Sequence, residues 1–265
     1  KTVYLVSSQK FSNDNQLLIV FSDISKLKTL EKMREDFIGN VSHELRTPIS
    51  VIKANSETLL STKLIKDENA INFTKAIQSQ SERMATIVNE LLSISSMESG
   101  DYPISLDKLN IKNIVDSAIK ELSPTTESSN IKLVNKISDV THIIGDESAI
   151  KIIISNYITN AIKHSPDDEI IEIDNEKIDK DFCRIKVIDN GIGIAKKYRE
   201  RVFERFFRVD KGRSKKIGGT GLGLSISKNL ALMMGYSVGV ESNEPKGSIF
   251  YIDVKIHQET SKEVA

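Results

Sequence analysis

Apolar side chains recur every three or four positions along residues 25–60. They are Leu27, Leu30, Met33, Phe37, Val41, Leu45, Ile49, Ile52 and, after one longer gap, Leu59. This spacing predicts a long amphipathic helix. His43, one of only four histidines, is two residues from both Val41 and Leu45. At about 100° per residue, the helix turns His43 roughly 200° away from the apolar stripe, so it is not a core side chain. Taken alone, it could be an ordinary exposed histidine.

A second helix is predicted after the polar stretch 61–69, and its apolar positions are spaced alternately by four and three. They are Phe73, Ile77, Met84, Ile87, Leu91 and Ile94, with the polar Gln80 at one position of the seam. Two antiparallel helices with seams this narrow cannot cover each other's apolar faces. We therefore expect residues 25–99 to form a helical hairpin that dimerises into a four-helix bundle, closed by stop signals at residues 99–103.

Residues 1–24 read as two short strands, Thr2–Ser7 and Gln16–Ser22, joined by a polar turn. Two strands alone do not make a stable sheet. The stretch Leu17–Ser25 resembles the end of a PAS sensor domain, which implies that residues 1–24 are the tail of such a domain. The alternative is a stray hairpin at the start of an excised piece.

Strands and helices are mixed over residues 100–265. Helices are predicted at residues 110–122, 147–164, 195–206 and 224–234, and strands at residues 131–137, 170–173, 184–188, 237–241 and 248–256. Pro166 stops the second of these helices. This order indicates a second domain, an α/β (α+β) sandwich.

Composition narrows the class of protein without naming a function. The 265 residues are 39% hydrophobic and carry a net charge of zero, so neither nucleic acid nor a membrane surface is favoured as a direct partner. The single cysteine, Cys183, excludes an internal disulfide and fits a reducing compartment. No apolar run approaches the roughly 18 residues of a membrane span. Because the chain starts at Lys1, an anchor could have been removed upstream.

Asn156 and Asn160 share one face of their predicted helix, and Lys163 extends that face. Asparagine is a poor residue inside a helix, so two in register suggest a use. Amide oxygens suit Mg²⁺, and a neighbouring lysine suits phosphate. The core face would be Ile150, Ile154, Ile158 and Ala161. A solvated polar face explains the same pattern equally well.

Two glycine-bearing segments follow predicted strands. In the turn Asp189–Gly193, the carboxylate of Asp189 could accept from an exocyclic amine, while Gly191 and Gly193 let the backbone approach a flat ring. An ordinary loop is the alternative. The glycines of residues 218–224 precede a helix, where free N–H groups bind phosphate. Their spacing is neither a P-loop nor a dinucleotide fingerprint. Residues 196–216 hold ten Lys or Arg against three Asp or Glu, which indicates a cationic flap or a solvated loop.

The order of these segments resembles the catalytic core of bacterial two-component sensor histidine kinases over residues 26–256. The sequence His43-Glu44-Leu45-Arg46-Thr47-Pro48 resembles the H box, and Asn156–Lys163 the N box. Asp189–Gly193 and Gly219–Leu224 resemble the two glycine boxes, and Phe203–Arg208 the F box. His164, where tyrosine is common, and Ser25, where the PAS-like tail usually ends in threonine, depart from the pattern.

The resemblance implies an ATP-binding domain of the Bergerat type, shared with gyrase and heat-shock chaperones. Asp189 would receive the adenine amine, and Asn156 and Asn160 would hold Mg²⁺. Lys163 and Arg208 would steady the phosphates, while Gly219, Gly221 and Gly223 would bind phosphate and hinge the lid. Leu222 and the glycines Gly191 and Gly193 would also belong to the nucleotide site. His43 would take the phosphoryl group, with Glu44 as its hydrogen-bonding base. Thr47 would position water for dephosphorylating the regulator.

The expected function is autophosphorylation of His43 by a homodimer, followed by transfer to an aspartate of a response regulator. By the same resemblance, the chain would be the cytoplasmic portion of a sensor anchored in the inner membrane, of the phosphate-regulon type. Two alternatives stay open, namely a regulator phosphatase or scaffold with feeble kinase activity, and an ATP-driven conformational clamp. A serine/threonine kinase is excluded, because no His-Arg-Asp or Asp-Phe-Gly motif occurs.

Overall fold

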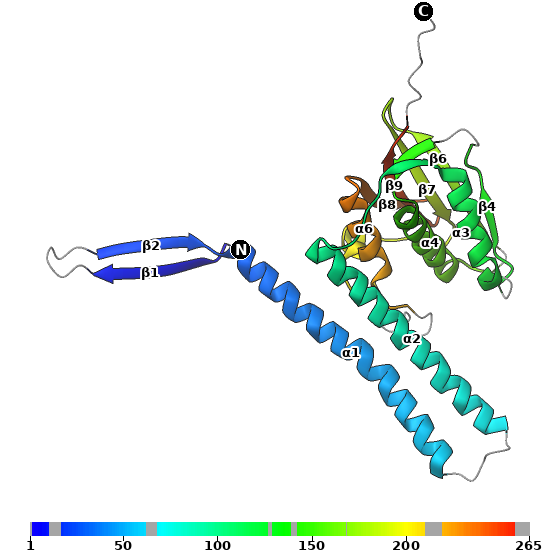
Figure 1. The fold of residues 1–265 in the computed structure, drawn as a ribbon, viewed down its shortest axis with the longest axis horizontal. Helices are drawn as coiled ribbons and strands as arrows, with labels where there is room; N and C mark the ends of the chain where they lie inside the picture. Colours follow the sequence, from blue (N-terminus) through cyan, green and yellow to red (C-terminus); the bar gives the residue numbers. More distant parts are fainter. Residues whose placement is uncertain are drawn as a thin grey trace, which may run out of the picture. The chain divides into compact units, whose positions relative to one another are not determined.

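A computed structural model describes residues 2–10, 17–61, 68–126, 129–138, 142–167, 169–209 and 219–257 (Figure 1). The chain divides into two compact units, residues 1–85 and 86–265. Helix α2, Glu68–Ser99, crosses this division without a break. The boundaries of the three predicted domains, at residues 24 and 99, stay predictions.

The first unit begins with the predicted hairpin. Strands β1 (Tyr4–Lys10) and β2 (Leu17–Asp23) pair antiparallel from Tyr4 opposite Asp23 to Lys10 opposite Leu17. The Asp23 carboxylate accepts from the backbone N–H of Ser25, at 2.9 Å, and Ser25 Oγ accepts from the N–H of Val3, at 2.8 Å. These bonds join the hairpin to the start of the next helix.

Helix α1, Ser25–Ser61, covers the predicted first helix and contains Pro48, whose ring is buried. Proline has no N–H, so the Glu44 carbonyl lacks its usual helical donor. The Glu44 carboxylate accepts from Nη2 of Arg83 on α2 at 3.0 Å, with both side chains about three-quarters buried. This ion pair joins the two helices of the predicted hairpin.

A mixed sheet forms the centre of the second unit. Its order is β4 (Lys132–Asn135), β6 (Ile170–Lys177), β7 (Phe182–Asp189), β9 (Ser248–Lys255) and β8 (Ser237–Ser242). Strands β4 and β6 are parallel, and the other neighbours are antiparallel. Strands β3 (Asp107–Asn110) and β5 (His142–Gly145) pair separately.

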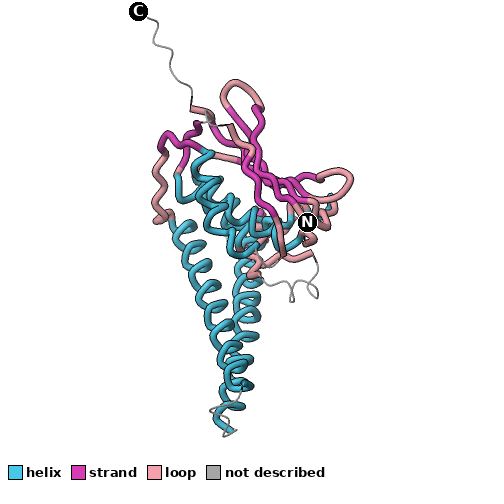
Figure 2. Tube along the Cα trace, turned by 90° about the vertical axis from the view of Figure 1, so that its right-hand side faces the viewer, coloured by secondary structure: helices cyan, strands magenta, loops and turns pink. Residues whose placement is uncertain are grey.

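Three helices cover one face of this sheet, as predicted for a sandwich (Figures 1 and 2). They are α3 (Ile111–Thr126), α4 (Glu147–His164) and α6 (Gly223–Met233). The predicted core face of α4 is confirmed, and Ile153 and Tyr157 are buried with it. Asp146 caps this helix by accepting from the N–H of Ala149 at 2.8 Å.

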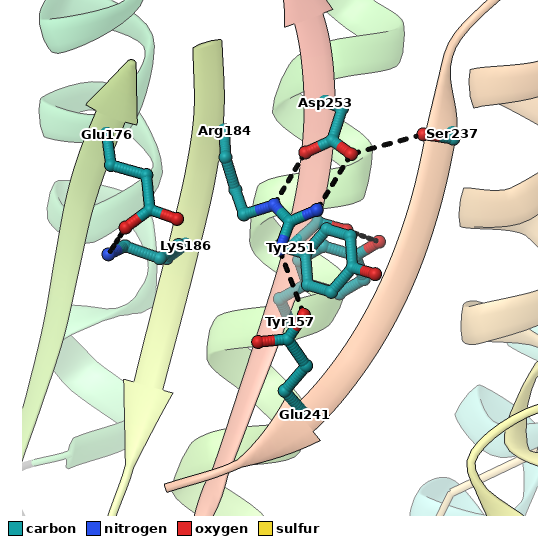
Figure 3. Close-up of polar contacts among 8 residues, drawn as sticks. All are labelled: Tyr157, Glu176, Arg184, Lys186, Ser237, Glu241, Tyr251 and Asp253. Carbon is teal, nitrogen blue, oxygen red and sulfur yellow. Dashed lines mark hydrogen bonds and ion pairs between the residues drawn. The ribbon is translucent and has the colours of Figure 1, made fainter. Parts of the chain in front are cut away.

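The opposite face of the sheet carries a polar network, shown in Figure 3. Arg184 on β7 donates through Nε and Nη2 to the two oxygens of Asp253 on β9, at 2.7 and 3.0 Å. Its guanidinium also bonds Glu241 and lies 3.6 Å from the centre of the Tyr251 ring. Burial therefore alternates along β7 and β9, and the helices cover only the apolar face.

Two predictions of secondary structure differ from the fold. Residues 195–206 form two 3₁₀ turns, Lys196–Tyr198 and Arg201–Phe203, instead of one helix. Glu204 is extended and Phe206 has a left-handed φ of 59°, which ends the helical path. Strands β3 and β5 were not predicted, because four residues are too few to show a period.

Candidate functional site

The residues predicted to bind ATP all lie in the second unit, on four of its segments. Asn156, Asn160 and Lys163 are on α4, and Asp189 ends β7. Gly191, Gly193, Arg208, Gly219 and Gly221 lie in the loops that follow, Leu222 is the N-cap of α6, and Gly223 is the first residue of α6. His43, Glu44 and Thr47 are on α1 in the first unit. The His43 side chain, Gly218 and the flap residues Lys211, Arg213, Lys215 and Lys216 lie outside the described residues.

Asp189 is buried at the end of β7, with 3% of its surface exposed. Its Oδ1 accepts from the backbone N–H groups of Gly191, at 2.8 Å, and Ser248, at 3.1 Å. Burial raises the pKa of Asp189, and these two N–H groups oppose the rise. Because both use the same oxygen, the carboxylate has a fixed orientation and Oδ2 remains to accept from a ligand.

Gly191 fits tightly beside this carboxylate. A Cβ on Gly191 would stand 2.5 Å from the carbonyl oxygen of His164 and 2.8 Å from Oδ1 of Asp189. Both distances are shorter than any real Cβ contact, so only glycine fits at this position. The sequence predicted that glycine here lets the backbone approach a flat ring. In the structure, the close neighbours of Gly191 are the end of α4 and Asp189 itself.

Asn156 joins α4 to the first turn of α6. Its Nδ2 donates to the carbonyl of Gly223 at 3.0 Å and to Oγ of Ser227 at 3.1 Å. Those two bonds use the donor side of the amide, which leaves Oδ1 as the acceptor. The structure thus gives Asn156 a role in holding the glycine-rich N-terminus of α6.

Lys163, Arg208 and Gly219 come together near the C-terminal end of α4. A Cβ on Gly219 would stand 3.7 Å from Nζ of Lys163, and the guanidinium of Arg208 donates to the carbonyl of Gly219. Lys163 and Arg208 are close enough to repel each other. Two cations beside a glycine-bearing backbone form a site suited to an anion.

Gly221 links the glycine-rich segment 219–223 to the residues that follow the second 3₁₀ turn. Its carbonyl accepts from the N–H of Phe206 at 2.8 Å, and a Cβ on Gly221 would stand 2.9 Å from the Cα of Phe206. Gly221 also has a φ of 77°. Both features require glycine, and the predicted lid is therefore tied to the segment Phe203–Arg208. Next to it, Leu222 is fully buried and its N–H bonds Oγ1 of Thr220.

Glu90 is a site residue that was not predicted from the sequence. It lies on the part of α2 that belongs to the second unit. Thr220 hydrogen bonds to its carboxylate, and Lys163 attracts it. Burial nevertheless raises the pKa of Glu90, and its buried Oε2 has no hydrogen-bond partner among the described residues. Burial lowers the pKa of Lys163, which Glu90 opposes. A carboxylate therefore faces the cation predicted to hold phosphate.

Glu90→Gln should change how stability depends on pH. Because its pKa is raised, the folded chain holds the Glu90 proton more tightly than the unfolded chain does. Its stabilising contribution is present below the unfolded pKa and is lost as pH rises through the folded pKa. We expect the variant to unfold at a higher urea concentration than the parent at neutral pH, with the difference vanishing below the unfolded pKa.

Glu98→Gln is the matched control for this measurement. Glu98 lies two turns further along α2, is exposed, and pairs with Arg205. Its loss removes an exposed ion pair, which should lower stability by at most about 1 kcal/mol at neutral pH. A Glu90→Gln variant that is less stable than the parent at neutral pH would contradict the role of burial.

Two features are absent from the described residues. No helix there is long and apolar enough to cross a bilayer. No group of three or more His, Cys, Asp or Glu side chains within the described ranges could hold a metal ion.

Two protein families match the chain. Residues 33–100 match the family described as His Kinase A (phospho-acceptor) domain. Residues 145–258 match the family of histidine kinase-, DNA gyrase B- and HSP90-like ATPases. The first begins within α1 and covers the rest of α1 and all of α2, and the second runs from the end of β5 through β9.

Curated relatives are similar along most of the chain. The sensor-like histidine kinase SenX3 of Mycolicibacterium smegmatis is 34% identical over 91% of the chain and 63% of the relative. The phosphate regulon sensor protein PhoR of Pseudomonas aeruginosa is 33% identical over 91% of the chain and 54% of the relative. The chain thus spans between half and two thirds of the length of these two relatives.

Solved structures share the fold. Full-length ShkA in complex with AMPPNP superposes with a TM-score of 0.63 at 26% identity, over 84% of this chain and 46% of that one. Histidine kinase ThkA in complex with response regulator protein TrrA superposes with a TM-score of 0.66 at 19% identity, over 95% of this chain and 74% of that one. At that identity, the ThkA likeness concerns the fold alone.

Proposed function

Since the chain belongs to the histidine kinases, with a phospho-acceptor domain followed by an ATPase domain, we propose that it phosphorylates His43 from ATP and passes the phosphoryl group to a response regulator. The acceptor on the regulator is an aspartate. His43 is therefore a substrate as well as a catalytic residue.

The observation that carries this proposal is the geometry of Asp189. A buried carboxylate at the start of a glycine-bearing turn is held through Oδ1 by two backbone N–H groups, and neither bond uses Oδ2. An exocyclic amine such as that of adenine donates to such an oxygen, and a 6-oxo group would be repelled by it. Lys163 and Arg208 then neutralise phosphate charge, and Gly219, Gly221 and Gly223 close the lid over it.

Asn156 and Asn160 on α4 would hold Mg²⁺ through their amide oxygens, as hard ligands suited to that ion. Since the Asn156 Nδ2 donates to α6, its Oδ1 would be the atom that serves as a hard oxygen ligand. Asn160, one turn further along α4, supplies the second amide. When bound, Mg²⁺ supplies charge neutralisation on the transferred phosphoryl group.

In the chemical step, a nitrogen of neutral His43 forms a bond to the γ-phosphorus, and the bond from that phosphorus to the β–γ bridging oxygen breaks. ADP leaves with the electron pair. Histidine has an unperturbed pKa of about 6.5, so its neutral form is abundant near neutral pH. Glu44 accepts the proton of the other ring nitrogen, and Arg83 holds the Glu44 carboxylate from α2.

The active form is a homodimer that carries its two helical hairpins in one bundle. Large apolar side chains on α1 and α2 are exposed in the single chain, among them Ile49, Ile71 and Leu92. A second copy would cover them. The chain would work at the cytoplasmic side of a sensor anchored in the inner membrane, and it would bind no nucleic acid directly.

A phosphotransfer assay tests the function, with the purified receiver domains of the source organism as acceptors. We expect labelled chain to transfer its phosphoryl group to one receiver much faster than to the others. Thr47→Ala should retain this transfer but slow dephosphorylation of the receiver by about tenfold or more, because Thr47 positions the attacking water. A labelled chain that transfers to no receiver would contradict the proposal.

A further inference from the structure

The loop between β8 and β9 holds the backbone of the turn Asp189–Gly193, called the Asp189 turn below. Nδ2 of Asn243 donates to the carbonyl oxygen of Asp189, at 3.0 Å, and to Oδ1 of Asn190, at 3.1 Å. The N–H of Asn243 bonds the carbonyl of Gly247, at 3.2 Å, which closes the loop on itself. The side chain of Asn243 thus bridges two residues of the turn from a loop far along the chain.

The orientation of both amides follows from their neighbours. Nδ2 of Asn190 donates to Oε2 of Glu169 at 3.0 Å, so Oδ1 of Asn190 must face the other way, toward Asn243. Asn243 meets two acceptors there, a carbonyl and an amide oxygen. Only its NH₂ group can satisfy them, since a carboxylate or a carbonyl at that place would repel both.

The same loop also packs closely on the turn and reaches the carboxylate. A Cβ on Gly247 would stand 1.9 Å from the carbonyl oxygen of Asp189, and one on Gly193 would stand 3.1 Å from the carbonyl oxygen of Gly247. The next residue, Ser248, donates its N–H to Oδ1 of Asp189. The loop therefore holds Asp189 at both ends, with Asn243 at the backbone and Ser248 at the side chain.

We propose that Asn243 is a positioning residue for recognition of the nucleotide base, because it fixes the backbone from which the Asp189 carboxylate reaches the exocyclic amine. The inference rests on the proposed ATP site and adds to it the residue that sets its base selectivity. Without Asn243, the Asp189 carbonyl and Asn190 Oδ1 lose a shared donor and the turn can move. The contact of Asp189 with the amine then weakens, while the phosphate contacts are unchanged.

The test compares two diphosphates by calorimetry on the full chain, ADP and purine riboside 5′-diphosphate, which lacks only the exocyclic amine. The parent should bind ADP at least about tenfold more tightly, as expected for a hydrogen bond to a charged group. Asn243→Ala should weaken ADP binding by about tenfold and leave the affinity for the analogue within about twofold, so that the ratio of the two affinities approaches one.

Asn135→Ala is the matched control, since the Asn135 amide also bonds a carbonyl and a side-chain oxygen, those of Lys112 and Asp116, away from the Asp189 turn. It should leave the ratio of affinities at the parent value. Asn243→Asp keeps the size of the side chain but turns an oxygen toward both acceptors, so it should lower the ratio at least as far as alanine does. Urea unfolding of each variant shows that it is folded.

Three results would overturn the inference. A parental ratio in Asn243→Ala would show that Asp189 does not depend on Asn243. An equal loss of affinity for both ligands would show a general structural role instead. Equal affinity of the parent chain for the two ligands would show that Asp189 does not bind the exocyclic amine of adenine. This result would contradict the proposed ATP site itself, and it is seen in the parent before any variant is measured.

Discussion

Asp189→Asn is expected to weaken ATP binding strongly while leaving the fold intact. The amide keeps one oxygen for the N–H groups of Gly191 and Ser248, but it places an NH₂ where the adenine amine must donate. Losing a charge-assisted hydrogen bond and opposing two donors should raise the Kd for ATP roughly 100-fold or more. Calorimetric titration with ATP in the presence of Mg²⁺ measures this.

The stability of this variant should move in the opposite direction. Burial raises the pKa of Asp189, so the ionised carboxylate opposes folding as pH rises through its folded pKa. A neutral amide removes that cost, and unfolding near neutral pH should need at least as much urea as in the parent. A variant that loses binding only because it unfolds would contradict the assignment.

Asp253→Asn is the matched control, because it makes the same substitution on the opposite face of the sheet. Asp253 accepts two bonds from Arg184 (Figure 3). The alternating burial along β7 and β9 puts it on the face of the sheet opposite to the buried Asp189. This variant should lose about 1–3 kcal/mol of unfolding free energy through the weakened ion pair, and it should bind ATP as the parent does. The two substitutions thus separate binding from stability.

Gly221→Ala is expected to disrupt the lid. The new Cβ would meet the Cα of Phe206 at 2.9 Å, and the φ of 77° strains any residue other than glycine. Relief requires the lid to move away from Phe206, which breaks the bond between the Phe206 N–H and the Gly221 carbonyl. We expect ATP affinity to fall at least about tenfold and unfolding free energy to fall by about 2–3 kcal/mol.

Gly235→Ala isolates the backbone part of this effect. Gly235 has nearly the same φ, 76°, but a Cβ there would meet nothing within 4 Å. The variant should lose only about 1–2 kcal/mol, the strain of a left-handed alanine, and retain its ATP affinity. Equal effects of the two substitutions on binding would show that the contact with Phe206 does not position the lid.

Local sequence patterns were sufficient to predict much of the fold and of the site. The helical period along residues 150–161 predicted the buried face of α4, because such a stripe must pack against the sheet. Gly191 and Gly221 occupy places where a Cβ does not fit, and glycine is the residue that marks such places in a sequence. A residue type that is needed for a steric reason can be recognised without the structure.

Contacts between distant segments could not be recognised in this way. Asn243 and Ser248 bond Asp189 across 54 and 59 residues of chain, and neither lies in a pattern that indicates a partner. Glu90 is next to Leu91, which is a seam position of the heptad pattern. A charged residue beside such a seam is expected to be exposed to solvent. The burial of Glu90 against Thr220 and Lys163 depends on the packing of α2 in the second unit.

Incubation with γ-labelled ATP and Mg²⁺ tests most directly whether His43 accepts the γ-phosphoryl group of ATP. The full chain should become labelled, and the label should be lost in acid and survive base, as a phosphoramidate does. His43→Gln should remain unlabelled while it binds ATP with the affinity of the parent. Label that persists in His43→Gln, or label that is stable to acid, would contradict the account.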